Sequence, residues 1–304
     1  MAVGPRLRRR VRGGKLSHRM ATTVTVATLA CVLLATPTTA MATTIPAGHF
    51  LSAPLSTRLT TTTTAPPAGE APGSSSDRSE PHASATVAPS SLPFAGYTWQ
   101  VKSSTSPIGP GPNIFDAKGP RVDASGAMQL RIVKVRSTWE SSEVVLGPTL
   151  GYGTYVWSVH GPVATLDPSV VLALFTYDTS DTSPTNREID FEASRFGTAS
   201  EPTNAQYVVQ PYETPGNLQR ITIPSGGTTT VSMTWVPGRV TFSGYTVRGR
   251  KTYLLPSWTN TSASVPTSST EQVHMSLWLF RGAAPTNGKP VSVDVTAFTF
   301  RPAG

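Results

Sequence analysis

Three carboxylates alternate with apolar residues in the segment 188–192. Glu188, Asp190 and Glu192 are separated by Ile189 and Phe191. On a β-strand the acidic side chains therefore face one way and the apolar pair faces the other. Like charges two residues apart repel, and this repulsion raises the pKa of at least one of them. One ionised carboxylate beside one protonated carboxylic acid is what a retaining glycosidase requires, the first as nucleophile and the second as proton donor.

The spacing of the outer two carboxylates is compatible with that chemistry. Positions i and i+4 lie about 13 Å apart along a flat strand. Glutamate side chains that lean inward across a concave sheet bring their carboxyls toward the ~5–5.5 Å of a double displacement. Asp190, between them, can share a proton with the nucleophile. Two plainer interpretations of the same pattern are a solvated acidic edge strand and a calcium-binding face.

The elements that position these residues are short strands. From about Leu92 onward, runs rich in Val, Ile, Thr, Tyr, Phe and Trp recur between clusters of Gly, Pro and Asn, and no segment keeps an apolar period of 3.6. The pattern predicts one all-β domain over residues 92–304, a two-sheet antiparallel sandwich. The predicted strands are 128–133, 152–159, 170–175, 188–192, 207–210, 229–235, 240–242, 274–279 and 291–300.

The first 91 residues have a different composition. Residues 1–42 combine seven basic residues and no acidic one with an apolar run and the A-x-A pattern Ala40-Met41-Ala42, which predicts a secretory signal peptide; an uncleaved anchor is the alternative. Removing the seven lowers the formal net charge from +8 to +1, so nucleic acid is not an expected partner. Residues 43–91, rich in Thr, Ser, Pro and Ala, are predicted to be a disordered linker. The only cysteine, Cys31, lies in the apolar run, so the mature chain uses no disulfide.

The acidic segment resembles the active-site strand of glycoside hydrolase family 16, in its form without a bulge. Members of that family have a concanavalin A-like jelly roll with a concave glycan-binding face and retain anomeric configuration. Five further segments resemble the family in the same order along the chain: Gly151–Tyr155, Val170–Tyr177, Thr234–Phe242, Met275–Trp278 and Val291–Phe298.

The resemblance assigns roles to single residues. It implies that Glu188 is the nucleophile, Asp190 the assisting acid and Glu192 the general acid/base. It also implies sugar contacts at Gln206 and Gln210, and stacking of Trp278 on a pyranose ring. The chain departs from the family pattern at Val156 and Ser158, which we expect to face the site in place of the usual Glu and Arg. Trp139 and Glu143 lie on one possible strand face; we interpret them as ordinary strand residues, with a glycan role as the alternative.

These observations predict a secreted retaining endo-glycosidase, with or without transglycosylase activity, that acts as a monomer on a β-linked polysaccharide such as a β-1,3/1,4-glucan. The alternative is a lectin-like glycan-binding module of the same fold without turnover. No cofactor and no metal is expected, although a structural calcium is compatible with the fold. The sequence has no zinc-type histidine spacing, no G-x-S-x-G elbow and no phosphate loop. No stable membrane span is expected after signal cleavage.

Overall fold

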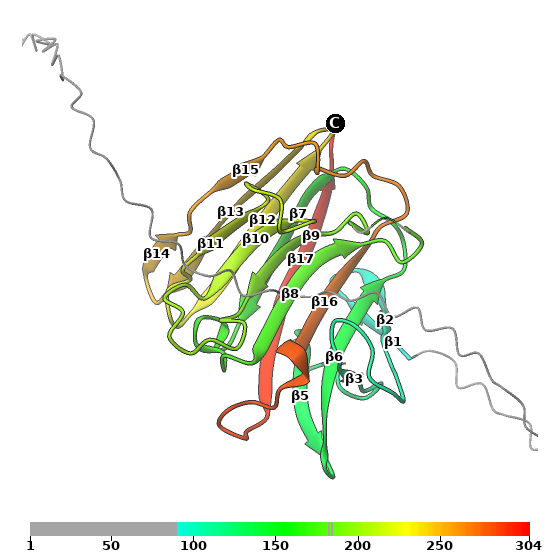
Figure 1. Ribbon diagram of the computed structural model, residues 1–304, viewed down its shortest axis with the longest axis vertical. Helices are drawn as coiled ribbons and strands as arrows, with labels where there is room; N and C mark the ends of the chain where they lie inside the picture. Colours follow the sequence, from blue (N-terminus) through cyan, green and yellow to red (C-terminus); the bar gives the residue numbers. More distant parts are fainter. Residues whose placement is uncertain (1–89, 182, 184) are drawn as a thin grey trace, which may run out of the picture. The chain divides into compact units, whose positions relative to one another are not determined.

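The computed structural model describes residues 90–181, 183 and 185–304. The predicted signal peptide and nearly all of the predicted linker lie outside these residues. The described part is a sandwich of two antiparallel β-sheets (Figure 1). Its helical segments are two single 3₁₀ turns, η1 (Val163–Thr165) and η2 (Phe280–Gly282). The predicted all-β fold class is confirmed. The first strand begins at Ser91, one residue before the predicted domain boundary.

One sheet, here called the cleft sheet, carries the acidic segment. All neighbouring strands in it run antiparallel. Its strands, in spatial order, are β1 (Ser91–Phe94), β2 (Tyr97–Val101), β6 (Thr138–Leu146), β16 (Gln272–Leu279), β8 (Val170–Tyr177), β9 (Ile189–Ala193), β10 (Ala205–Val209) and β11 (Leu218–Ile221).

The second sheet, here called the back sheet, covers the opposite side of the core. Its strands, in spatial order, are β4 (Arg121–Val122), β5 (Met128–Val135), β17 (Val291–Pro302), β7 (Gly153–His160), β12 (Thr228–Val236) and β13 (Arg239–Arg248), followed by β14 (Lys251–Leu254) and β15 (Trp258–Asn260), which both pair with β13. At one corner β5 also pairs with β6, and the short β3 (Ile114–Phe115) lies parallel to β6. This corner joins the two sheets.

Large apolar side chains fill the space between the sheets. Trp99 and Phe191 of the cleft sheet and Trp157 and Trp235 of the back sheet are 0% exposed. Burying side chains of this size contributes about 2–3 kcal/mol each, and this core needs no disulfide in the described domain, where the sequence has no cysteine.

Candidate active site

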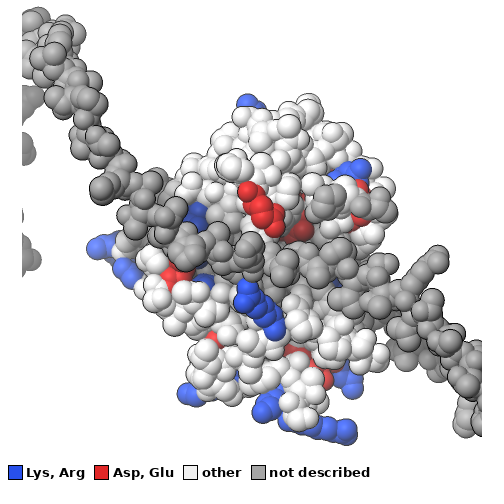
Figure 2. All heavy atoms as spheres, viewed as in Figure 1, with Lys and Arg blue, Asp and Glu red and all other residues white. Residues whose placement is uncertain are grey.

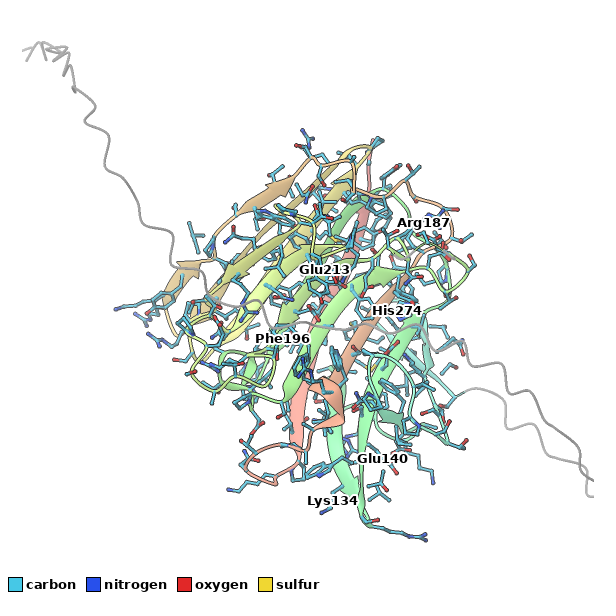
Figure 3. All side chains as sticks on the ribbon, viewed as in Figure 1. Lys134, Glu140, Arg187, Phe196, Glu213 and His274 are labelled. Carbon is cyan, nitrogen blue, oxygen red and sulfur yellow. The ribbon has the colours of Figure 1, made fainter. Side chains whose placement is uncertain are left out.

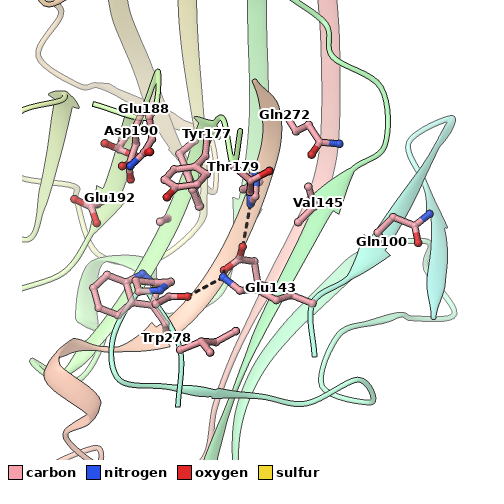
Figure 4. Close-up of a pocket in the computed structure, with 18 of the residues that line it drawn as sticks. Gln100, Glu143, Val145, Tyr177, Thr179, Glu188, Asp190, Glu192, Gln272 and Trp278 are labelled. Atoms are coloured by element: carbon pink, nitrogen blue, oxygen red, sulfur yellow. Dashed lines mark hydrogen bonds and ion pairs between the residues drawn. The ribbon is translucent and has the colours of Figure 1, made fainter. Parts of the chain in front are cut away.

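Strand β9 places the three carboxyls on one face of the cleft sheet. Its neighbours are β8 and β10, and Ile189, Phe191 and Ala193 are buried in the core. Because strand side chains alternate, Asp190 and Glu192 point out of the core, and Glu188 follows the same parity one residue before the strand begins. Figure 4 shows the three side chains in one column, all directed to the same side. The predicted alternation is therefore present in the structure.

A cleft of about 680 Å³ lies over this face. Carbohydrate and small-molecule sites are commonly concave and of this size. Glu188 and Glu192 are partly exposed in the cleft, whereas Asp190 is 2% exposed beneath them. The outer carboxyls can therefore reach a ligand, and the central one acts through its neighbours. The cleft residues used below are Lys102, Glu143, Tyr177, Glu188, Asp190, Glu192, His274 and Trp278.

All three carboxyls have raised pKa values. For Glu188 the main cause is burial, with further contributions from the charges of Glu192 and Glu143. Burial also raises the pKa of Asp190 well above its ordinary value, and the charges of Glu188 and Glu192 raise it further. A hydrogen bond joins the Asp190 and Glu188 carboxyls; it raises the pKa of Asp190 and lowers that of Glu188. Within this bond Asp190 is therefore the proton donor, and Glu188 is the member that ionises first, at a pKa of about 8.

Glu192 has a separate set of partners. Burial raises the pKa of its carboxyl, while a hydrogen bond from Gln206 and the charge of Arg220 partly offset that effect. The Gln206 side-chain amide donates to Glu192 Oε2 at 2.7 Å and accepts from Arg220 Nη1 at 3.0 Å. Arg220 is fixed by bonds to Thr203 and Ser194 and lies over the Phe196 ring. This chain of contacts fixes the orientation of the Glu192 carboxylate.

The turn before Glu188 has an unusual backbone. Asn186 and Arg187 have φ values of 46° and 49°, in the left-handed region that non-glycine residues seldom adopt. An ion pair holds the turn, because Arg187 Nη1 lies 2.6 Å from Asp178 Oδ2 and 3.3 Å from Asp181 Oδ2. Arg187 Nε also donates to the Thr267 carbonyl, at 3.2 Å. Arg187, labelled in Figure 3, thus ties the end of β8 to the residue that precedes the acidic strand.

Asp178 is the buried anchor of this turn, at 1% exposed. Burial raises the pKa of its carboxyl, but hydrogen bonds from Ser180, Thr270 and Arg187 outweigh that effect and lower the pKa to about 2. The carboxylate is therefore ionised throughout the neutral range and keeps its pairing with Arg187. The turn holds Glu188 in register beside Gln210, whose backbone N–H donates to the Glu188 carbonyl at 3.1 Å.

A second ionic group lies in the same cleft, on β6, on β16 and at the residue that follows β2. Glu143 is 1% exposed; its two oxygens lie 2.9 Å from Lys102 Nζ and 2.9 Å from His274 Nδ1. The His274 ring stacks on Phe175 at 4.9 Å and meets Tyr177 edge-on at 5.7 Å. Figure 4 shows Glu143 of this group across the cleft from the acidic column. Because Glu143 spans both contacts, it joins three strands of the cleft sheet.

The structure places Glu143 in the cleft, which favours the alternative interpretation of this residue; its contact with a glycan stays a prediction. The pairing of Glu143 with His274 was not predicted, because segment 138–146 is polar, with Ser141 and Ser142 beside Glu143, and was not among the predicted strands. These residues are buried because each has a partner: Ser141 donates to Asn113 and Ser142 donates to the Arg131 carbonyl. The even spacing of His274, Ser276 and Trp278 was the available signal. It places them on one face of a strand.

The predicted sugar-contact residues occupy different places. Trp278 lines the cleft, as stacking requires. Gln206 is 8% exposed and uses both ends of its amide on Glu192 and Arg220. Gln210 donates to Asp190 Oδ2 at 3.5 Å. Neither glutamine is among the residues that line the cleft. Direct contact of Gln206 and Gln210 with a sugar stays a prediction.

The expected site-facing position of Val156 and Ser158 was wrong. Both lie on β7 in the back sheet, between β12 and β17, on the far side of the core from the cleft. The expectation assigned the site-facing positions to the wrong strand. The strand that follows Gly151, β7, belongs to the back sheet, whereas the strand before it, β6, belongs to the cleft sheet. Glu143 and Val145 of β6 are the cleft-lining residues in this part of the chain.

Neither a metal cluster nor a membrane-spanning helix is found in the described part of the chain. Residues 90–304, apart from positions 182 and 184, contain no group of three or more His, Cys, Asp or Glu side chains arranged to hold a metal ion. Over the same residues no helix is long and apolar enough to cross a membrane. The expectation that the protein uses no cofactor stays a prediction.

The fold is shared with solved β-glucanase structures. A β-glucanase of Bacillus licheniformis matches with a TM-score of 0.53 at 18% identity, over 72% of this chain and 100% of that one. A Mycobacterium tuberculosis antigen described as a pseudo β-1,3-glucanase matches at 0.52 and 18%, over 70% and 94% of the two chains. A family 16 protein of the Bacteroides ovatus mixed linkage glucan PUL, in complex with a G4G4G3G product, matches at 0.50 and 14%, over 67% and 94%.

No protein-family model and no curated protein matches the sequence. At such low identity the structural likeness shows the fold alone. The chain has a glycoside hydrolase family 16-like fold, and the predicted jelly-roll architecture is confirmed.

Proposed function

We propose that this protein is a secreted, retaining endo-glycosidase that cleaves a β-linked polysaccharide. The observation that carries the proposal is the column of three carboxyls over one cleft, with two outer members partly exposed and a central, proton-holding member buried. Burying three mutually repelling carboxyls is costly for a structural strand. Double displacement uses this asymmetry, because it needs one anionic and one protonated carboxyl.

In the first step, an ionised Glu188 carboxylate oxygen attacks the anomeric carbon. Asp190 donates its hydrogen bond to Glu188, which keeps the proton off the nucleophile. Glu192 gives its proton to the glycosidic oxygen as the bond to the leaving sugar breaks. The product of this step is a covalent glycosyl ester on Glu188 and a free sugar end.

In the second step, Glu192 acts as a base. It takes a proton from water, or from a sugar hydroxyl in transglycosylation, and the resulting oxygen displaces the Glu188 ester. The Gln206–Arg220 chain supports both states of Glu192, because the amide N–H stabilises the carboxylate that exists between the steps. Two inversions at one carbon leave the anomeric configuration unchanged.

The open cleft favours a polymeric substrate cut within its chain. Trp278 on β16 offers an aromatic face at one side of the acidic column, and Tyr177 lies beside that column (Figure 4). The proposed substrate class is a β-1,3/1,4-glucan, which agrees with the names of the β-glucanases that share the fold. The proposed location is outside the cell, and the proposed working unit is a monomer.

The second candidate function is glycan binding without turnover. Its supporting observation is the likeness to the chain described as a pseudo β-1,3-glucanase. The two candidates differ in what they require of the carboxyls: binding alone needs no nucleophile and no proton donor of raised pKa. The presence of all three in one cleft favours the enzyme.

Incubation of the protein with barley β-glucan, laminarin, xyloglucan and agarose tests the proposal. We expect reducing ends from at least one polymer with the wild type and none with Glu188→Ala. The control is Glu140→Ala, which removes a glutamate at the far end of β6 from the cleft (Figure 3) and keeps activity. A wild type that binds a polymer in this panel and releases no reducing ends contradicts the enzymatic proposal and supports the second candidate.

A further inference from the structure

A hollow lies in the floor of the cleft between Glu143 and Glu192. The strand register places Ser276 opposite Glu143 on one side and opposite Ala173 on the other. Ala173 in turn lies opposite Glu192. Neighbouring strands are about 4.8 Å apart, so the Cα atoms of the two glutamates at the ends of this row are roughly 14 Å apart. Serine and alanine between them are the smallest side chains of the row, and they leave room above them for one sugar ring.

Rings border this hollow along the strand direction. On β16, His274 precedes Ser276 by two residues and Trp278 follows it by two, so all three side chains are on the cleft face of the strand. On β8, Phe175 lies opposite His274, and the two rings stack at 4.9 Å. His274, Phe175 and Trp278 line the cleft. The hollow is therefore closed on four sides, by two carboxylate side chains and by rings at both ends.

Two buried polar atoms at the hollow, His274 Nε2 and Ser276 Oγ, have no hydrogen-bond partner among the described residues. His274 is 4% exposed and Ser276 is 0% exposed. The other two buried side-chain atoms of this kind in the described part of the chain, Trp157 Nε1 and Tyr207 Oη, belong to residues of the core between the sheets. Buried polar groups are nearly always hydrogen-bonded. Two exceptions at successive positions of one cleft face point to a ligand that supplies the missing bonds.

The contact with Glu143 determines what His274 offers to that ligand. The Glu143 carboxylate, paired with Lys102, only accepts hydrogen bonds, so the His274 Nδ1 that lies 2.9 Å from it carries the ring hydrogen. In the neutral imidazole Nε2 is then an acceptor. Because Nε2 is farther from Cβ than Nδ1 is, it lies at the outer end of the ring. Both Glu143 oxygens are used within the protein, so this residue positions His274.

We propose that the hollow is a subsite for one neutral pyranose unit, in which a sugar hydroxyl donates to His274 Nε2 and a second hydroxyl bonds to Ser276 Oγ. The unit lies beside Glu192, the proposed proton donor. Glu143 and Glu192 on both sides disfavour a uronate by like charge. Figure 2 shows acidic atoms in the middle of the cleft-sheet face and most basic side chains at its margin. The inference rests on the proposed function only in that the cleft holds a glycan.

Calorimetric titration of the full-length Glu188→Gln variant with barley β-glucan, laminarin and xyloglucan tests the subsite without turnover. We expect at least one of these neutral polymers to bind and polygalacturonate not to bind. Added to that variant, His274→Asn keeps a donor near the position of Nδ1 and removes the acceptor at Nε2, so binding should weaken about tenfold. Ser276→Ala should weaken binding about fivefold without lowering Tm, because its hydroxyl has no partner in the unliganded protein. His160→Asn, at an exposed histidine of the back sheet, is the matched control and should bind like Glu188→Gln.

Nitrogen NMR of the same variant, labelled with ¹⁵N-histidine, separates a ligand contact from a structural role. We expect hydrogen on Nδ1 of His274 and a shift of its Nε2 resonance when the polymer binds, with the His160 signals unchanged. Unaltered binding in His274→Asn and Ser276→Ala, with an unmoved Nε2 resonance, overturns the subsite and leaves the proposed hydrolysis standing. Weakened binding in both variants, together with a wild type that releases no reducing ends, supports the subsite and contradicts the hydrolysis. Binding of polygalacturonate as tight as that of the neutral polymers, or no binding of any neutral polymer, also overturns the subsite.

Discussion

The side-chain amide of Gln206 joins Glu192 to Arg220: its nitrogen lies 2.7 Å from Glu192 Oε2 and its oxygen lies 3.0 Å from Arg220 Nη1. The outer carboxylate of the acidic column is thus connected to a cation outside the cleft. Both the hydrogen bond and the charge of Arg220 lower the pKa of Glu192 against the effect of burial. This connection lowers the pH at which the buried Glu192 carboxyl loses its proton.

Loss of that hydrogen bond should move the basic limb of the pH–activity profile. In Gln206→Met the Glu192 carboxylate loses its donor, so its pKa rises and kcat/KM stays high to a higher pH, by about one unit. The pH dependence of kcat/KM on a soluble polymer measures this change. Gln210→Met, which removes a donor to Asp190 instead, is the matched control and should leave the basic limb in place. A basic limb that does not move in Gln206→Met contradicts the assignment of Glu192 as the acid.

The buried carboxyl of Asp190 should cost stability at neutral pH. Its folded-state pKa lies above that of the unfolded chain, so the folded state binds more protons, and stability falls as pH rises from about 4 through the raised pKa. Asp190→Asn removes this dependence. The variant should unfold at a higher temperature than the wild type at pH 7 in differential scanning calorimetry, and the difference should shrink toward pH 4. Each pH unit between the folded and unfolded pKa values corresponds to about 1.4 kcal/mol of unfolding free energy.

Asp178→Asn provides the control of opposite sign. The folded-state pKa of Asp178 is lowered to about 2, so its contribution is present above the unfolded value of about 4 and is lost as pH falls through 2. This variant should be less stable than the wild type at pH 7. If the two variants change thermal stability in the same direction at pH 7, the protonation scheme of the acidic column is wrong.

The ion pair at the turn before β9 should affect catalysis by holding Glu188 in position relative to Glu192. Arg187→Gln releases Arg187 from Asp178 and from the Thr267 carbonyl. The left-handed backbone at Asn186 and Arg187 then loses its restraint, and Glu188 moves relative to Glu192. We expect kcat to fall about 100-fold with a smaller change in KM, because a small displacement of the reacting groups slows the chemical step by about that factor. Arg195→Gln, an arginine on the loop after β9, should keep near-normal kcat. Equal losses in both variants contradict a positioning role for Arg187.

Glu143 should contribute to stability across the cleft sheet. Glu143→Gln removes the charge that Lys102 and His274 share, and breaking a buried pair costs about 3 kcal/mol, or roughly 10 °C in Tm for a domain of this size. Differential scanning calorimetry measures the change. Glu213→Gln, at an exposed glutamate, should change Tm by less than about 2 °C. A small change in Glu143→Gln shows that the three strands do not depend on this ionic group.

The strands that alternate apolar with polar residues could be predicted from sequence. Segment 170–175, nearly all apolar, and segment 188–192, strictly alternating, became β8 and β9 within two residues at each end. Strand β6 could not, because Ser141, Ser142 and Glu143 look like loop residues until their partners on other strands are known. The buried environment of a polar residue is a long-range property. Its signal does not lie in its own segment.

The site could be predicted in the same partial way. Glu188, Asp190 and Glu192 were identified because their chemistry depends on spacing within one strand. His274, Lys102 and the Asp178–Arg187 pair were not, because their roles arise from contacts between different segments, which for Glu143 and His274 lie 131 residues apart. The prediction that Val156 and Ser158 face the cleft was wrong for a related reason. The order of strands in the chain does not reveal which sheet each one joins.

The most direct test of the catalytic proposal is the configuration of the first product. Proton NMR of a reaction on a soluble β-glucan, recorded before mutarotation equilibrates the new reducing ends, reads the anomeric signal. Double displacement through Glu188 predicts that the β-anomer appears first and then decays to the mixture, with no such signal in Glu188→Ala. An α-anomer as the first product contradicts the covalent intermediate and, with it, the assigned roles of Glu188 and Glu192.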